Sequence, residues 1–115
     1  MPNPVVHFEV LGKDAEALQA FYGKVFDWEL NPVMPTYAMV AKQADGIAGG
    51  IGAPPDGSAG HVTFYVQVDD LAGALEQIES AGGRTVQPPM DVPNGPSIAL
   101  FADPEGHVIG LVKSA

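Results

Sequence analysis

The chain has 115 residues, 46% of them apolar, and 14 acidic against 5 basic residues give it a formal charge of −9. This composition predicts one domain with a hydrophobic core, and the negative charge argues against nucleic acid or an anionic membrane as a partner. The absence of cysteine excludes disulfides, zinc–thiolate sites and thiol nucleophiles. No apolar run approaches the roughly 20 residues that span a bilayer, and no signal-peptide pattern opens the chain, so we expect a soluble cytoplasmic protein.

The first half of the chain reads as a strand, a helix and three strands. Residues 5–10 alternate apolar and polar side chains, which is the period of a strand. Asp14 is placed to cap a helix that ends near residue 27. The apolar stripe of this helix consists of Leu18, Phe21, Tyr22 and Val25. Further strands are expected over residues 28–33, 36–42 and the glycine-rich 46–52.

The second half repeats this order after a linker rich in proline and glycine. A strand over residues 60–68 leads into a helix from Leu71 to about residue 81, capped by Asp69 or Asp70 and stopped by two glycines. Strands are expected at 84–87, 96–102 and 108–113, with Pro88 and Pro89 ending the first of them. The chain therefore divides into module one (about 1–52), a linker (53–59) and module two (about 60–115).

The strand that opens the second half has two different faces. Val62, Phe64, Val66 and Val68 point to one side and are expected to pack on a helix. His61, Thr63, Tyr65 and Gln67 point to the other side. An imidazole, a hydroxyl, a phenol and an amide in a row suit the wall of a wet cavity, so this face predicts a pocket.

Several motifs, taken in order, resemble one protein family. They are His7-Phe8-Glu9-Val10, Phe21-Tyr22, Phe26-Asp27-Trp28, Val68-Asp69-Asp70-Leu71 and Asp103-Pro104-Glu105-Gly106-His107. Together they resemble the vicinal oxygen chelate superfamily of glyoxalases, bleomycin- and fosfomycin-resistance proteins and extradiol dioxygenases. The resemblance implies an α+β fold with two βαβββ modules, whose mixed sheet forms a cup with helices outside. It also implies a homodimer, and it gives His107 a structural role in a turn.

Catalytic members of this family hold a divalent metal at four strand positions, and the resemblance carries these onto His7, Gly49 or Gly50, Thr63 and Gly110. Only the first of them offers a metal-ligating side chain. A divalent catalytic ion needs about three protein ligands, so we expect no metal and no other cofactor. An offset arrangement of His7, His61 and Glu9 remains as an alternative.

Two interpretations of the glycines stay open. Glycine in place of two bulky carboxylates would enlarge the floor of a cup and suit a bulky organic guest. Glycine also relieves crowding in a curved sheet.

The sequence therefore predicts a metal-independent protein that binds a small organic molecule in a cup at or near a homodimer interface, for sequestration or resistance. The acidic charge favours a cationic guest. The candidate ligand-binding residues are His7, Glu9, Tyr37, Met39, His61, Thr63 and Tyr65.

Two alternatives accompany this prediction. One is an enzyme, a lyase, isomerase or dioxygenase with an atypical metal, or a metal-free acid–base catalyst that uses His7 and Glu9. His7 also fits a plain wall residue bonded to a neighbouring strand. The other alternative is an interaction module whose cup is vestigial and filled by Tyr37, Met39 and Tyr65.

Overall fold

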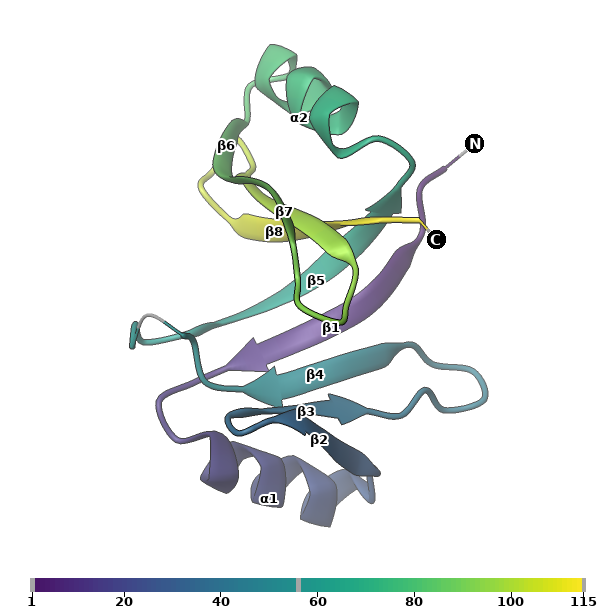
Figure 1. Cartoon of the computed structure of the whole chain (residues 1–115), viewed down its shortest axis with the longest axis vertical. Coiled ribbons are helices and arrows are strands. Elements are labelled where there is room, and N and C mark those ends of the chain that lie inside the picture. The colour runs from purple at the N-terminus through teal and green to yellow at the C-terminus, as the bar shows by residue number, and fades with distance from the viewer. Residues whose placement is uncertain (1, 56, 115) are drawn as a thin grey trace. The chain divides into compact units, whose positions relative to one another are not determined.

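The computed structural model describes residues 2–55 and 57–114, and in these residues two βαβββ modules follow one another (Figure 1). The α+β fold class predicted from the sequence is confirmed. Neither helix among the described residues is long and apolar enough to cross a membrane. The chain forms two compact units, one from His7 to Thr63 and a C-terminal unit that joins the residues after Thr63 to those before His7.

The His7–Thr63 unit contains a mixed sheet in the order β2-β3-β4-β1. Strand β1 (Val5–Leu11), whose first two residues belong to the C-terminal unit, runs parallel to β4 (Ala48–Gly52). Strand β3 (Tyr37–Val40) runs antiparallel to both β4 and the outermost strand β2 (Leu30–Met34). Helix α1 (Ala15–Phe26) lies along this sheet (Figure 1).

Helix α1 begins and ends where its sequence predicts. The carboxylate of Asp14 accepts a hydrogen bond from the amide of Ala17 at 3.0 Å, which caps the first turn. Asp27 ends the helix in the left-handed conformation, with φ of 58°.

The predicted apolar stripe of α1 is only partly buried. Leu18 and Tyr22 are half-buried, whereas Phe21 and Val25 are 56% and 54% exposed. Leu18 and Tyr22 continue the line of the buried Ala15, because steps of three and four residues stay on one side of a helix. Phe21 lies three residues after Leu18 and Val25 three after Tyr22, so helical spacing alone does not separate the exposed members of the stripe from the half-buried ones.

The C-terminal unit contains a second mixed sheet in the order β5-β8-β7-β6. Strand β5 (His61–Val68), which begins in the other unit, runs parallel to β8 (Val108–Lys113). Strand β7 (Ser97–Ala102) runs antiparallel to both β8 and the outermost strand β6 (Arg84–Asp91). Helix α2 (Leu71–Ser80) covers one face of this sheet.

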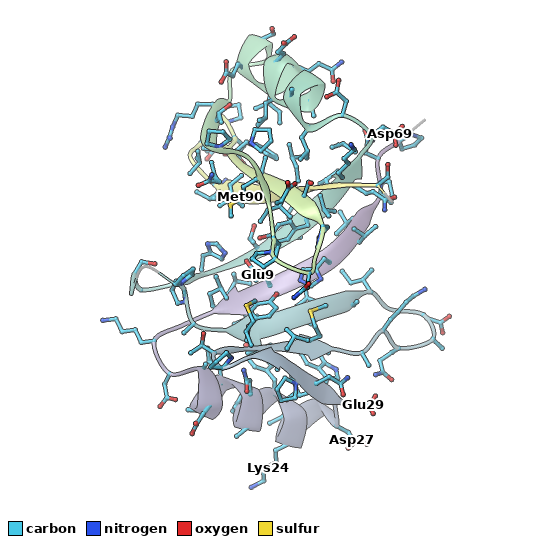
Figure 2. The ribbon with its side chains drawn as sticks, viewed as in Figure 1. Glu9, Lys24, Asp27, Glu29, Asp69 and Met90 are labelled. Carbon is cyan, nitrogen blue, oxygen red and sulfur yellow. The ribbon has the colours of Figure 1, made fainter. Side chains whose placement is uncertain are left out.

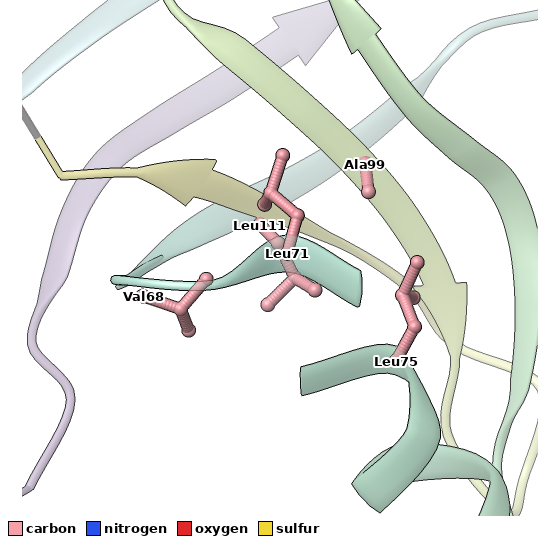
Figure 3. Packing of buried hydrophobic residues seen from close by; sticks show 5 residues of the cluster. All are labelled: Val68, Leu71, Leu75, Ala99 and Leu111. Atoms are coloured by element: carbon pink, nitrogen blue, oxygen red, sulfur yellow. The ribbon is translucent and has the colours of Figure 1, made fainter. Parts of the chain in front are cut away.

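The core of the C-terminal unit lies between α2 and the sheet (Figure 3). Its buried members are Val68, Leu71, Leu75, Ala99 and Leu111. The carboxylate of Asp70 accepts a hydrogen bond from the amide of Gly73 at 3.1 Å and starts the helix directly above this cluster. Asp70, and not Asp69, is therefore the cap.

The apolar face of β5 does not pack on a helix along its whole length, as the sequence predicted. Val68 belongs to the core, but Val62 is 78% and Phe64 is 39% exposed, while Thr63 and Tyr65 are buried. Helix α2 packs on β6, β7 and β8, and from β5 only Val68 and the adjoining Val66 contribute to the core beneath it. Over residues 61–65 the polar face is thus the more buried one.

The expectation that Pro88 and Pro89 end a strand is wrong, because β6 continues to Asp91. Proline lacks an amide donor, but β6 is outermost in its sheet, where half of the backbone groups need no partner strand. The pairing with β7 also shifts register between Gln87 and Met90, which accommodates both rings.

We expect Asp70→Ala to lower the free energy of unfolding by about 1 kcal/mol, because an amide at the start of α2 loses its acceptor. Urea unfolding followed by circular dichroism measures this change. Asp70→Ser is the matched control, since its hydroxyl can still accept the hydrogen bond. Equal stabilities of the two variants would contradict the assignment of Asp70 as the cap.

Candidate functional site

A chain of hydrogen bonds joins four side chains of the His7–Thr63 unit. The hydroxyl of Tyr37 donates to Glu9 Oε2 at 3.0 Å and lies 3.1 Å from His7 Nε2. The other carboxylate oxygen, Glu9 Oε1, lies 3.1 Å from His61 Nε2. Glu9 projects from the middle of β1 (Figure 2) and is at the centre of the chain. We call His7, Tyr37, Glu9 and His61 the polar chain.

The strand pairing explains why these residues meet. His7 and Glu9 are two residues apart on β1 and therefore share a face. Strand β4 lies between β1 and β3, and its Gly50 is aligned with Glu9 on one side and with Met39 on the other. Tyr37 is two residues from Met39 and shares the same face, so its phenol can reach across β4.

Gly50 makes this reach possible. A Cβ atom at position 50 would overlap the hydroxyl and ring of Tyr37. The phenol therefore occupies the space that a side chain at this position would fill. Any larger residue at position 50 would displace the phenol from His7 and Glu9.

The polar chain combines buried and half-buried groups. Glu9 is only 9% exposed, whereas the side chain of His61 is 31% exposed. Burial lowers the pKa of the His7 imidazole below its ordinary value of 6.5, and the negative charge of nearby Glu9 opposes part of that shift. The neutral form of His7 is thus favoured in the folded protein.

The C-terminal unit shows the same pairing of glycine and tyrosine. Gly110 on β8 is aligned with Tyr65 on β5, as Gly50 on β4 is aligned with Glu9 on β1. A Cβ atom at Gly110 would overlap the ring of Tyr65, which is buried. Within each unit, a tyrosine ring therefore takes the volume that the glycine leaves.

This finding bears on the two interpretations of the glycines. The volume at Gly50 and Gly110 is occupied by rings, so in neither unit does the missing side chain itself leave a space for a guest. The glycines instead relieve crowding beneath the tyrosines.

The structure brings together four of the seven predicted site residues, the members of the polar chain. Met39 lies half-buried beside Gly50 on the same face, and Thr63 is buried on β5. Tyr65 belongs to the C-terminal unit. The sequence placed His7 and Glu9 on one face, and in the structure the phenol of Tyr37 bridges them.

Sequence reasoning missed the bridge by Tyr37, and it grouped His61 with Glu9 only as alternative metal ligands and not as hydrogen-bond partners. The available signal was Gly50, because a glycine inside a strand often marks the close approach of another group.

The side chains at the metal-ligand positions do not fit a metal centre. The spaces above Gly50 and Gly110 hold tyrosine rings and not carboxylates. Across residues 2–55 and 57–114, no three His, Asp or Glu side chains are grouped closely enough to ligate an ion.

An open hollow of about 460 Å³ lies elsewhere, at the start of α2 beside β6 in the C-terminal unit. None of the predicted site residues lines it.

Comparison with known proteins places this fold in a family. Residues 5–111 match the Glyoxalase/Bleomycin resistance protein/Dioxygenase superfamily, and the chain belongs to it. The resemblance noted in the sequence is thereby confirmed.

Individual relatives are more distant. The chain is 32% identical to CFP32 of Mycobacterium tuberculosis over 77 residues, covering 66% of this chain and 30% of that protein. It is 27% identical over 128 residues to the anthracycline biosynthesis protein DnrV of Streptomyces peucetius, covering 96% and 46%. The chain thus spans less than half the length of these two relatives.

Among solved structures, methylmalonyl-CoA epimerase from Mycobacterium tuberculosis is similar, with a TM-score of 0.73. Its sequence is 18% identical, and the match covers 96% of this chain and 87% of that one. At this identity the likeness establishes the fold alone.

We expect the free energy of unfolding to fall as the pH is lowered below 6.5, the ordinary pKa of histidine. In that range the unfolded chain binds a proton at His7 more readily than the folded chain, so protonation favours unfolding. The contribution is complete above the unfolded pKa and is lost as the pH falls toward the lower folded value. Urea unfolding at a series of pH values measures the slope.

His7→Gln should reduce that slope, because glutamine does not titrate but keeps an N–H donor for Tyr37. An unchanged slope in this variant would show that His7 does not cause the pH dependence.

Proposed function

We propose that this protein binds a small organic molecule without a metal ion, using the face of the His7–Thr63 unit that carries the polar chain. The observation that supports this most directly is that donors and acceptors on this face are held in fixed positions by one another. Glu9 accepts at both oxygens, and Tyr37 links it to His7. Pre-positioned polar groups of this kind give a binding site its specificity.

The charge of the chain supports a cationic guest. A formal charge of −9 attracts cations over long distances and raises their concentration near the surface. Met39 and Tyr37 add thioether and aromatic surface on the same face, which suits an aromatic or aliphatic body. Aromatic ammonium compounds combine both properties, and a role in sequestration or resistance would follow from binding them.

We also propose that the protein acts as a homodimer. Family membership supports this, and so do the exposed apolar side chains of α1. Exposed apolar groups that gather on one helix often mark an interaction surface.

Thermal-shift measurements with aromatic ammonium compounds, including cationic antibiotics, test the binding proposal. The melting temperature should rise with ligand concentration, because a ligand that binds only the folded state stabilises it. Treatment with a chelator should leave the shift unchanged. His7→Gln should weaken the shift, whereas His107→Gln, at the exposed turn of the C-terminal unit, should not.

Two outcomes would contradict this proposal. One is the absence of a shift with cationic antibiotics and common aromatic metabolites. The other is a shift that appears only when a divalent metal is added.

The polar chain also favours a second candidate function, metal-free acid–base catalysis by His7 and Glu9. A carboxylate, a phenol and two imidazoles in hydrogen-bond contact can pass a proton between a substrate and the protein. The uncharged imidazole of a buried histidine can accept that proton.

Incubation of carbonyl compounds in D₂O tests this candidate, since removal and return of a proton next to a carbonyl exchanges hydrogen for deuterium. Exchange should fall at least tenfold in both His7→Gln and Glu9→Gln and should persist in His107→Gln. Binding of a compound without any exchange or turnover would leave the binding function as the sole proposal.

A further inference from the structure

The single proton of the Tyr37 hydroxyl determines how the polar chain is oriented. A carboxylate oxygen accepts hydrogen bonds and has no proton to give, so the phenol must donate to Glu9 Oε2. The phenol oxygen is then available to His7 only as an acceptor. His7 Nε2 must therefore carry the proton in their 3.1 Å contact.

We propose that Tyr37 is the positioning residue of this site, which holds the neutral His7 ring in the Nε2–H tautomer. Nδ1 is then the basic nitrogen of the imidazole. A histidine ring without such a partner samples both tautomers, and the hydrogen bond at one nitrogen sets the role of the other.

The rest of the polar chain supports this arrangement. His61 Nε2 donates to Glu9 Oε1, so the carboxylate is held from its other side and keeps Oε2 directed at Tyr37. Burial favours the neutral imidazole over the charged one, and only a neutral ring has a tautomer to select. Three hydrogen bonds thus fix one proton position on His7.

Gly50 is also needed for the hydrogen bonds that set the tautomer of His7. Because a Cβ atom there would overlap the Tyr37 hydroxyl, the bridge exists only with glycine at this position. Gly50 therefore controls the tautomer of His7 without touching it, through the position of the phenol.

Proton–nitrogen correlation spectra of ¹⁵N-labelled protein at a pH well above 6.5 test the tautomer directly. Wild type should show His7 protonated at Nε2 only. Tyr37→Phe keeps the ring but removes the acceptor, so His7 should become a mixture of both tautomers. Tyr22→Phe, which removes a hydroxyl from a ring stacked on Trp28, is the control and should leave the spectrum of His7 unchanged.

A second variant keeps the proposal testable if Tyr37→Phe fails to fold. Gly50→Ala retains the phenol but displaces it, and should give the same mixture of tautomers. Gly46→Ala is its control, because a Cβ there would meet only Gln43 Cβ at 3.8 Å. Wild-type His7 protonated at Nδ1, or a single Nε2–H tautomer that persists in both site variants, would overturn the proposal.

Discussion

The site depends on one steric constraint, the close approach of the Tyr37 phenol to the backbone of β4 at Gly50. Without a side chain at this position, the phenol lies between His7 and Glu9 and hydrogen-bonds with both. The carboxylate of Glu9 is buried, and burying it would be costly without the donors that Tyr37 and His61 provide. The packing of the Tyr37 ring over Gly50 therefore also provides a hydrogen-bond donor for the buried carboxylate of Glu9.

The contact between Tyr37 and Gly50 is a feature of the side chains, whereas the fold that carries it is that of the family. The superfamily supplies two βαβββ modules, each with a parallel pair of strands whose aligned residues face the same side. In both modules a glycine on one of these strands lies beneath a tyrosine ring. Because side chains and not folds perform chemistry, the activities of other members do not transfer to a site built from an internal phenol.

Much of the fold could be predicted from local patterns, because these depend on neighbouring residues. Alternation located β1 and β5, and Asp14 and Asp70 started both helices as capping residues. Local patterns gave wrong predictions where the position of a strand in its sheet, or the packing of a helix, decides the outcome. Pro88 and Pro89 continue a strand because β6 is outermost in its sheet, and Phe64 is exposed on the face expected to pack because α2 packs on β6, β7 and β8.

By itself the sequence determined the order of the elements, the helix caps, the family and a face that carries His7 and Glu9, since all of these follow from residue types and short spacings. Only the tertiary structure decided which side chains meet. Tyr37 is 28 residues from Glu9 in the chain, and His61 is 52 residues from it. Contacts at such separations depend on strand order, register and the space above a glycine, and none of these can be derived from the spacing of residues along the chain.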